Sequence, residues 1–142
     1  MADHPMIEVS IVTPDGKVYE HDANLLEVAT QTGPIGIMLN HLPLIANLEI
    51  AETRVKYGDQ EDRIAVNGGF IEFIDNKAMI VADSAENQSD IDVARAQSAK
   101  ERSEAEIKKA KAKRDQQSLD RAQIALRRAI NRINVAKIDK DQ

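Results

Sequence analysis

The chain has 142 residues, enough for one ordinary domain or for a small domain with an appendage. It contains no cysteine, which excludes disulfides and thiol nucleophiles, and it lacks the apolar run of about 18 residues that a transmembrane helix requires. The net charge of −5 conceals two unequal parts, because residues 1–85 carry a net −9 and residues 86–142 a net +4. All glycines and prolines precede residue 70. We therefore predict two units, residues 1–86 and residues 87–142.

The first unit shows the pattern of short β-strands separated by turns. Residues 7–11 (IEVSI) alternate apolar and polar side chains, the period of a half-buried strand, and the TPDG segment that follows from Thr13 supplies turn residues. Further breaks are expected in the polar segment 56–63, at the glycine pair 68–69 and at residues 75–76. No stretch has the length of a crossover helix, so we predict an antiparallel β-sandwich or barrel.

Enzymatic chemistry has little support in this unit. The segment 32–48 is rich in glycine and proline, which favours irregular or bent strand structure. Its Gly33-x-x-Gly36 pair lacks the lysine and the serine or threonine of a P-loop. His41 lies between apolar residues, which is typical of a hydrogen-bonded structural histidine, and the histidines show no ligand spacing. We therefore expect no catalytic residues and no metal site.

The second unit is predicted to be an antiparallel hairpin of two helices. From Ser89 onward, strong helix formers dominate, Ser89 with Asp92 fits a capping box, and residues 114–120 are the predicted bend. The second helix carries a heptad-like apolar stripe of Leu119, Ala122, Leu126, Ala129, Ile133 and Ala136. The expected stripe of the first helix is Ala94, Ala99 and Ala105, with Ile91 and Ile107. Alanine buries little apolar area, so the contact between the two helices (the seam) contributes little free energy and the hairpin can open.

Arginines on both helices form a candidate anion site. On an ideal helix Arg121, Arg128 and Arg132 lie within about 40° of one another, and Arg95 follows Asp92 by one turn. An antiparallel hairpin brings Asp92 and Arg95 toward Arg128 and Arg132, and guanidinium forks match phosphate oxygens. Two alternatives stay open here. The arginines are solvated helix surface, with Asp92 only capping its helix, or they dock on an acidic protein surface.

Nucleic acid is not an expected partner of the basic unit. This part of the chain has no aromatic residue on which bases can stack, and the whole chain is acidic.

Motifs along nearly the whole chain resemble the epsilon subunit family of bacterial F-type ATP synthases. The similar segments are VSIVTPDGKVYE from Val9, the G-x-x-G-x-x-x-x-H-x-P-L pattern of residues 33–44, Gly68-Gly69-Phe70, DIDVARAQSAKER from Asp90, and ALRRAINR from Ala125. One departure is Met38-Leu39-Asn40, where many members have Leu-Pro-Gly. Their shared order and spacing make the match close.

The resemblance implies a β-sandwich followed by two helices, in a non-catalytic rotor subunit that couples proton flow to ATP synthesis. Its implied partners are the γ subunit, the c-ring and the α and β subunits. Its implied place is the cytoplasmic face of the bacterial cell membrane, with membrane contact only through the complex. A different class of function also fits the residue patterns, a free-standing sandwich with a coiled-coil arm that binds an acidic protein.

The resemblance further implies regulation by ATP, because a subset of these subunits binds ATP through an I-D-x-x-R-A motif that is complete here. The implied ATP-binding residues are Glu86, Ile91, Asp92, Arg95, Ala96, Arg128 and Arg132. The basic residues implied to contact acidic β-subunit segments and inhibit hydrolysis are Arg121, Arg127, Arg128 and Arg132. ATP is thus expected as a regulatory ligand, and the sequence requires no metal.

Overall fold

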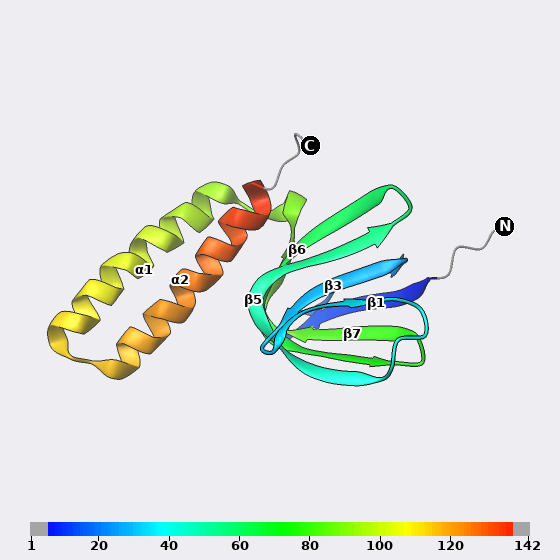
Figure 1. The fold of residues 1–142 in the computed structure, drawn as a ribbon. Helices are drawn as coiled ribbons and strands as arrows, with labels where there is room; N and C mark the ends of the chain where they lie inside the picture. The colour runs from blue at the N-terminus through cyan, green and yellow to red at the C-terminus, as the bar shows by residue number, and fades with distance from the viewer. Residues whose placement is uncertain (1–5, 138–142) are drawn as a thin grey trace. The chain divides into compact units, whose positions relative to one another are not determined.

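A computed structural model describes residues 6–137 of the chain, which divides into two compact units, residues 1–88 and residues 89–142. The first unit contains β-strands, and the second contains two long helices packed on each other (Figure 1). The predicted fold class, a β-sandwich domain followed by a helical hairpin, is confirmed.

Within residues 6–88 the first unit has eight strands, which lie in the order β2-β1-β7-β6-β5-β3-β4, with β8 paired to β6. The strands are β1 (Ile7–Thr13), β2 (Gly16–Ala23), β3 (Leu25–Thr30), β4 (Gly33–Ile37), β5 (Leu44–Tyr57), β6 (Gln60–Ile74), β7 (Lys77–Ala82) and β8 (Ala85–Asn87). Neighbouring strands are antiparallel except β1 and β7, which pair in parallel, so the expectation of purely antiparallel pairing was wrong in this detail. Intervening strands, and not a helix, make the connection from β1 to β7.

The core of this unit is aliphatic, as the low aromatic content requires. Alternate residues of β1, β3 and β7 point inward, and Phe73 is the largest fully buried side chain. The buried cluster includes Ile7, Val9, Ile11, Leu26, Val28, Ile37, Val55, Ile64, Val66, Ile71 and Ile80.

Two of the expected breaks lie within long strands. The glycine pair 68–69 does not separate two strands, because β6 runs through it. Both glycines have positive φ, and a Cβ on Gly69 would lie 2.0 Å from the carbonyl oxygen of Val81, so this position requires glycine. The glycines let β6 bend at the point where its neighbour on one edge changes from β8 to β7.

The polar segment 56–63 is also mostly strand, with only Gly58 and Asp59 between β5 and β6. Its charged side chains pair across the strands. Lys56 and Arg54 of β5 contact Glu27 of β3 at 3.0 Å each, and Arg63 of β6 contacts Glu52 of β5 at 2.8 Å. Arg63 also contacts Glu61 of its own strand at 3.0 Å. Cross-strand ion pairs of this kind explain how a polar segment remains in the sheet.

The loop that departs from the family pattern is shaped by Asn40. Its φ of 68° lies in the left-handed region, which asparagine tolerates better than most residues, so it can stand where the resembled pattern has glycine. The backbone N–H of Asn40 donates to Asn76 Oδ1 at 2.6 Å, and the side-chain Nδ2 of Asn76 donates to Asn40 Oδ1 at 3.3 Å. Next to it, His41 Nδ1 lies 2.8 Å from the Leu42 carbonyl oxygen, in agreement with the expected structural role.

The hairpin consists of α1 (Val93–Lys113) and α2 (Gln116–Lys137), preceded by a short 3₁₀ turn, η1 (Gln88–Asp90). Asp92 is the N-cap of α1, because its Oδ1 accepts from the Arg95 amide at 3.0 Å. The predicted capping box beginning at Ser89 was therefore wrong, since Ser89 lies in the 3₁₀ turn. The bend is shorter than residues 114–120, because Asp115 caps α2 through the amide and hydroxyl of Ser118.

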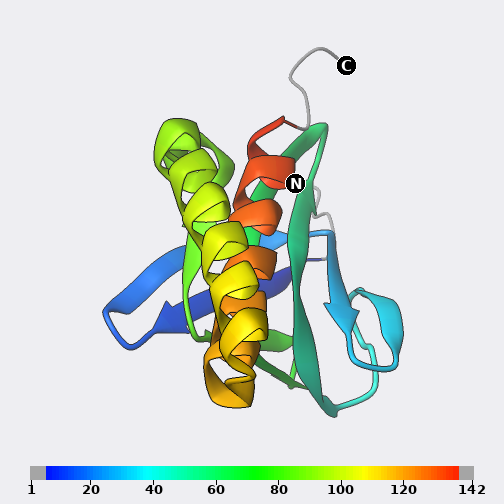
Figure 2. The same cartoon turned by 90° about the vertical axis from the view of Figure 1, so that its left-hand side faces the viewer.

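The two helices lie side by side (Figure 2), and mainly small residues are buried between them. The predicted stripe of α2 is confirmed, with Ala122, Ala129 and Ile133 buried. The predicted stripe of α1 was wrong at Ala94 and Ala105, which are exposed, whereas Ile91 is buried and Ala99 and Ile107 are half-buried. The buried residues of α1 are instead Ala96, Ser103 and Ala110, which are spaced by seven residues. Seven residues are about two helical turns, so every two turns of α1 place one small residue against α2.

Candidate anion-binding face of the helical hairpin

The first part of the candidate site lies at the start of α1. Asp92 and Arg95 are exposed, one turn apart, whereas Ile91 and Ala96 are buried. Asp92 already has a structural role as the N-cap. The capping alternative is thus realised in this structure, and any contact of Asp92 with a ligand would be additional to it.

The second part of the site lies on α2. Arg128 and Arg132 are half-buried and both have polar or electrostatic partners, whereas Arg121 and Arg127 are exposed. Arg127 precedes Arg128 by one position, or about 100° around the helix, so it points away from the face that Arg128 presents.

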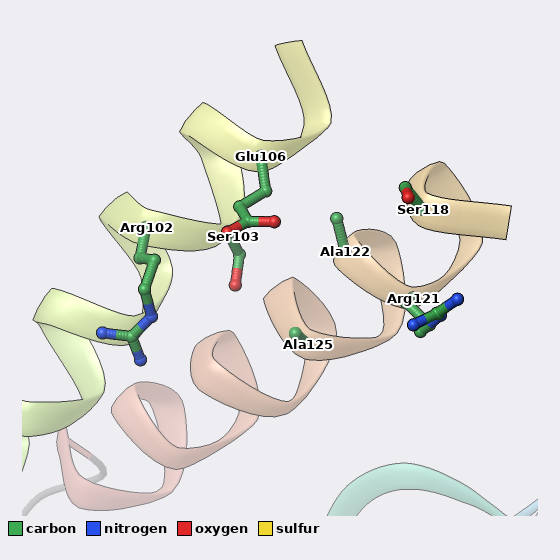
Figure 3. Close-up of a pocket in the computed structure, with 7 residues that line it drawn as sticks. All are labelled: Arg102, Ser103, Glu106, Ser118, Arg121, Ala122 and Ala125. Carbon is green, nitrogen blue, oxygen red and sulfur yellow. The ribbon is translucent and has the colours of Figure 1, made fainter. Parts of the chain in front are cut away.

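A cleft between the helices shows which residues of α1 lie opposite which residues of α2 (Figure 3). It has a volume of about 260 Å³, and its lining residues are Arg102, Ser103, Glu106, Ser118, Arg121, Ala122 and Ala125. The same antiparallel register, continued by two turns away from the bend, places Arg95 and Ala96 opposite Arg128, Ala129 and Arg132. Arg95 and the two α2 arginines therefore share one level of the hairpin, with Asp92 one turn beyond them.

Glu86 and Arg121 lie elsewhere. Glu86 is a half-buried residue of β8, where it pairs with Ala65 of β6 in the first unit. Arg121 lines the cleft, two turns nearer the bend than Arg128. The sequence prediction left Arg102 and Ser103 out of the site, although the seven-residue spacing from Arg95 to Arg102 was a usable signal.

The face suits binding better than catalysis. Guanidinium groups bind anions through charge and paired hydrogen bonds. Within residues 6–137, no group of three or more histidine, aspartate or glutamate side chains is arranged to hold a metal ion. None of the helices in that range is long and apolar enough to cross a membrane.

Family models match both units. The ATP synthase delta/epsilon chain β-sandwich domain matches residues 6–88, and the long α-helix domain of the same family matches residues 89–137. The ATP synthase epsilon chain of Levilactobacillus brevis is 61% identical over 138 residues, covering 96% of this chain and 99% of the relative. That of Pediococcus pentosaceus is 62% identical over 138 residues, with the same coverage.

A solved structure supports the fold. A chain of the Euglena gracilis mitochondrial ATP synthase aligns with a TM-score of 0.77 at 19% identity, covering 96% of this chain and 84% of its own length. The chain therefore belongs to the ATP synthase delta/epsilon chain family, as an epsilon-type member, a non-catalytic component of the proton-transporting F-type ATP synthase and its central stalk.

Proposed function

We propose that the helical hairpin binds ATP as a regulatory ligand without hydrolysing it. The observation that carries the proposal is the shared level of Arg95, Arg128 and Arg132, which come from both helices. The proposed site also includes Glu86, Ile91, Asp92 and Ala96. The arginines bind the phosphates, and the acidic side chains accept hydrogen bonds from the nucleoside. No metal is required by this set of residues.

The direct test is calorimetric titration of the full chain with ATP. Replacing either Arg95 or Arg128 by alanine should weaken ATP binding by roughly 10- to 100-fold, since each removes a charge-assisted hydrogen bond. Arg127→Ala is the matched control, because it removes the same charge from a position about 100° away from the face of Arg128. Unchanged affinity in both variants would restore the solvated-surface interpretation.

The two roles of Asp92 can be separated by substitution. Asparagine caps helices about as well as aspartate, so Asp92→Asn should keep α1 intact while removing the carboxylate. If the carboxylate contacts ATP, Asp92→Asn weakens ATP binding without changing the unfolding temperature of the hairpin. An Asp92→Asn variant with the affinity of the natural chain would leave this residue only its cap.

We further propose that the two units divide the work of the subunit. The sandwich (residues 1–86) attaches to the γ subunit and the c-ring, and the hairpin (residues 87–142) controls hydrolysis at the α and β subunits. The proposed place of the chain is the cytoplasmic face of the bacterial cell membrane, reached only through the complex. Membership of the family favours this function over a free-standing adaptor.

The proposed control is a competition between two states of the hairpin. ATP binds only the folded hairpin, because the site needs residues of both helices. In the extended state, the same basic residues contact acidic segments of the β subunits and inhibit hydrolysis, namely Arg121, Arg127, Arg128 and Arg132. A ligand that binds one state alone stabilises it by about 2.7 kcal/mol at a hundredfold excess over Kd. Such an amount can shift a hairpin whose seam is mostly alanine.

A further inference from the structure

We propose that the side-chain amides of Asn40 and Asn76 position the loop 38–42 for the attachment of the sandwich to the central-stalk and c-ring assembly. The inference rests on the attachment proposed above and adds the residues that prepare it. It concerns the segment between β4 and β5, where that segment meets the turn between β6 and β7. All of the contacts that carry it lie within the first unit.

Residues 38–41 form a type II turn. The backbone N–H of His41 donates to the carbonyl oxygen of Met38 at 3.0 Å, and Asn40, the third residue of the turn, has a φ of 68°. Leu39, the second residue, does not have a positive φ. This type of turn favours proline at the second position and glycine or asparagine at the third. Asn40 therefore suits the turn, whereas leucine at position 39 leaves φ there free to vary.

Asn76 is a fixed anchor beside this turn. Asn76 and Asp75 have φ values of 62° and 52°, as the two central residues of a type I′ hairpin require, and the flanking Ile74 and Lys77 pair across β6 and β7. The Asn76 carbonyl oxygen also accepts from the backbone N–H of Glu8 on β1 at 3.1 Å. Three strands therefore hold the backbone of Asn76 in place, independently of its side chain.

The Asn76 side chain contacts the turn at Asn40 through both of its polar atoms. Its Oδ1 accepts from the backbone N–H of Asn40 at 2.6 Å, and its Nδ2 donates to Asn40 Oδ1 at 3.3 Å. The next residue is also attached, because the His41 ring meets the buried Phe73 edge-on, with 5.9 Å between the ring centroids. The amide pair thus supplies the constraint that proline would otherwise give to the turn.

The fixed loop presents apolar side chains to solvent. Met38 is 59% exposed and Leu42 is 78% exposed, and the pairing of β5 with β6 brings Ile45 and Ile74, 73% and 50% exposed, to the same end of the sandwich. Large exposed apolar side chains that gather in one place are typical of a protein–protein contact. The chain is a component of the central stalk, so the stalk and c-ring assembly is the partner that fits this contact. A loop fixed beforehand loses less conformational freedom on binding than a mobile one.

Hydrogen exchange of the full chain, followed by NMR, tests the positioning. Glycine adopts positive φ readily, so Asn76→Gly keeps its hairpin turn while removing both side-chain bonds. It should speed exchange of the His41 N–H roughly fivefold or more, because the turn loses the hydrogen bonds that hold it. Asn40→Gly keeps the 2.6 Å bond and should have a smaller effect. Asp75→Gly is the matched control, since it changes the neighbouring residue of the same hairpin turn, and it should leave the exchange of His41 unchanged.

A proline at position 39 separates positioning from general stability. Within residues 6–137 the Leu39 N–H makes no hydrogen bond, so Leu39→Pro removes none, and it fixes φ where the turn favours proline. In the Leu39→Pro background, Asn76→Gly should speed the exchange of His41 by less than about twofold. Equal acceleration in both backgrounds would overturn the proposal, because proline in the loop cannot replace a contact that only stabilises the hairpin turn of Asn76.

Binding of the full chain to ATP synthase complexes stripped of this subunit tests the consequence for attachment. Asn76→Gly should weaken binding by roughly tenfold, Asp75→Gly should not, and the loss should shrink in the Leu39→Pro background. If the natural chain binds and Asn76→Gly binds equally well, the positioning role is overturned while the proposed attachment stands. If the natural chain does not bind, the attachment itself fails and the inference falls with it. Self-association of the chain in sedimentation, lost in Asn76→Gly, would assign the loop to a second copy and also overturn the proposal.

Discussion

At the scale of single residues, Gly69 is a position of the sandwich where any side chain would clash with the backbone. Its φ is 125°, and an added Cβ would lie 2.0 Å from the backbone oxygen of Val81, which cannot move without breaking the pairing of β6 with β7. Gly69→Ala should therefore lower the free energy of unfolding by more than about 3 kcal/mol, as severe backbone conflicts do. Urea denaturation of the full chain measures it.

Gly58 provides the control for this prediction. Its φ of 59° is also left-handed, but a Cβ there would meet nothing within 4 Å. Gly58→Ala should cost only about 1–2 kcal/mol, the penalty of the left-handed region alone. Equal losses in the two variants would show that the clash at Gly69 is relieved by adjustment of the sheet.

A second prediction at this scale concerns the two tyrosines of the sandwich. Both donate to Asp62 Oδ2, Tyr19 at 2.7 Å and Tyr57 at 3.0 Å. Burial, followed by the hydrogen bond to this carboxylate, raises the pKa of both hydroxyls. The folded state therefore favours the neutral tyrosines. Their contribution to stability is complete below about pH 10, the pKa of unfolded tyrosine, and is lost as the pH rises above it.

The urea midpoint of the sandwich should thus fall above about pH 10, and Tyr19→Phe should reduce that fall. At neutral pH, Tyr19→Phe should cost about 1 kcal/mol, because Asp62 keeps its bond from Tyr57. An unchanged alkaline slope in Tyr19→Phe would mean that other groups set the pH dependence.

Single residues also show where the sequence was informative. The alternation of residues 7–11 predicts β1 correctly, because one face of that strand meets the core and the other does not. The glycine pair 68–69 was misread because glycine marks both turns and bends within strands, and only tertiary pairing distinguishes them. Ser103 was missed because its burial depends on the register of the two helices.

At the scale of elements, the close approach of the two helices depends on the small residues buried between them. Ala129 is fully buried in α2, whereas Ala94 of α1 is exposed. Ala129→Leu should force the helices apart and destabilise the hairpin by about 1–3 kcal/mol, while Ala94→Leu should change its stability by less than about 0.5 kcal/mol. Helicity followed by circular dichroism during heating tests both. A large loss in Ala94→Leu would restore the stripe expected from the sequence.

The phase error in α1 has a physical cause. The alanines of this helix are distributed around it, so composition alone does not say which of them face α2. In α2 the larger side chains of the stripe help to mark the packing face, because Ile133 is buried and Leu119 and Leu126 are half-buried. The sequence therefore predicts the packing face where side chains are large, and it fails where they are all small.

At the scale of the whole molecule, the division in charge and glycine content coincides with the change from strands to helices along the chain. The candidate site could be predicted in part, because helix geometry groups the arginines. The roles of these side chains follow only from binding measurements, since the same face suits ATP, phosphate or an acidic protein.

The central claim is that ATP holds the hairpin in a folded, non-inhibiting state. The most direct measurement is the ATP hydrolysis rate of the reconstituted ATP synthase, with the full chain or with a chain lacking residues 89–142, at low and at high ATP. We expect that the truncated chain still assembles and that its complex hydrolyses ATP faster at low ATP, with the difference shrinking as ATP rises. Equal rates for the two complexes at every ATP concentration would contradict it.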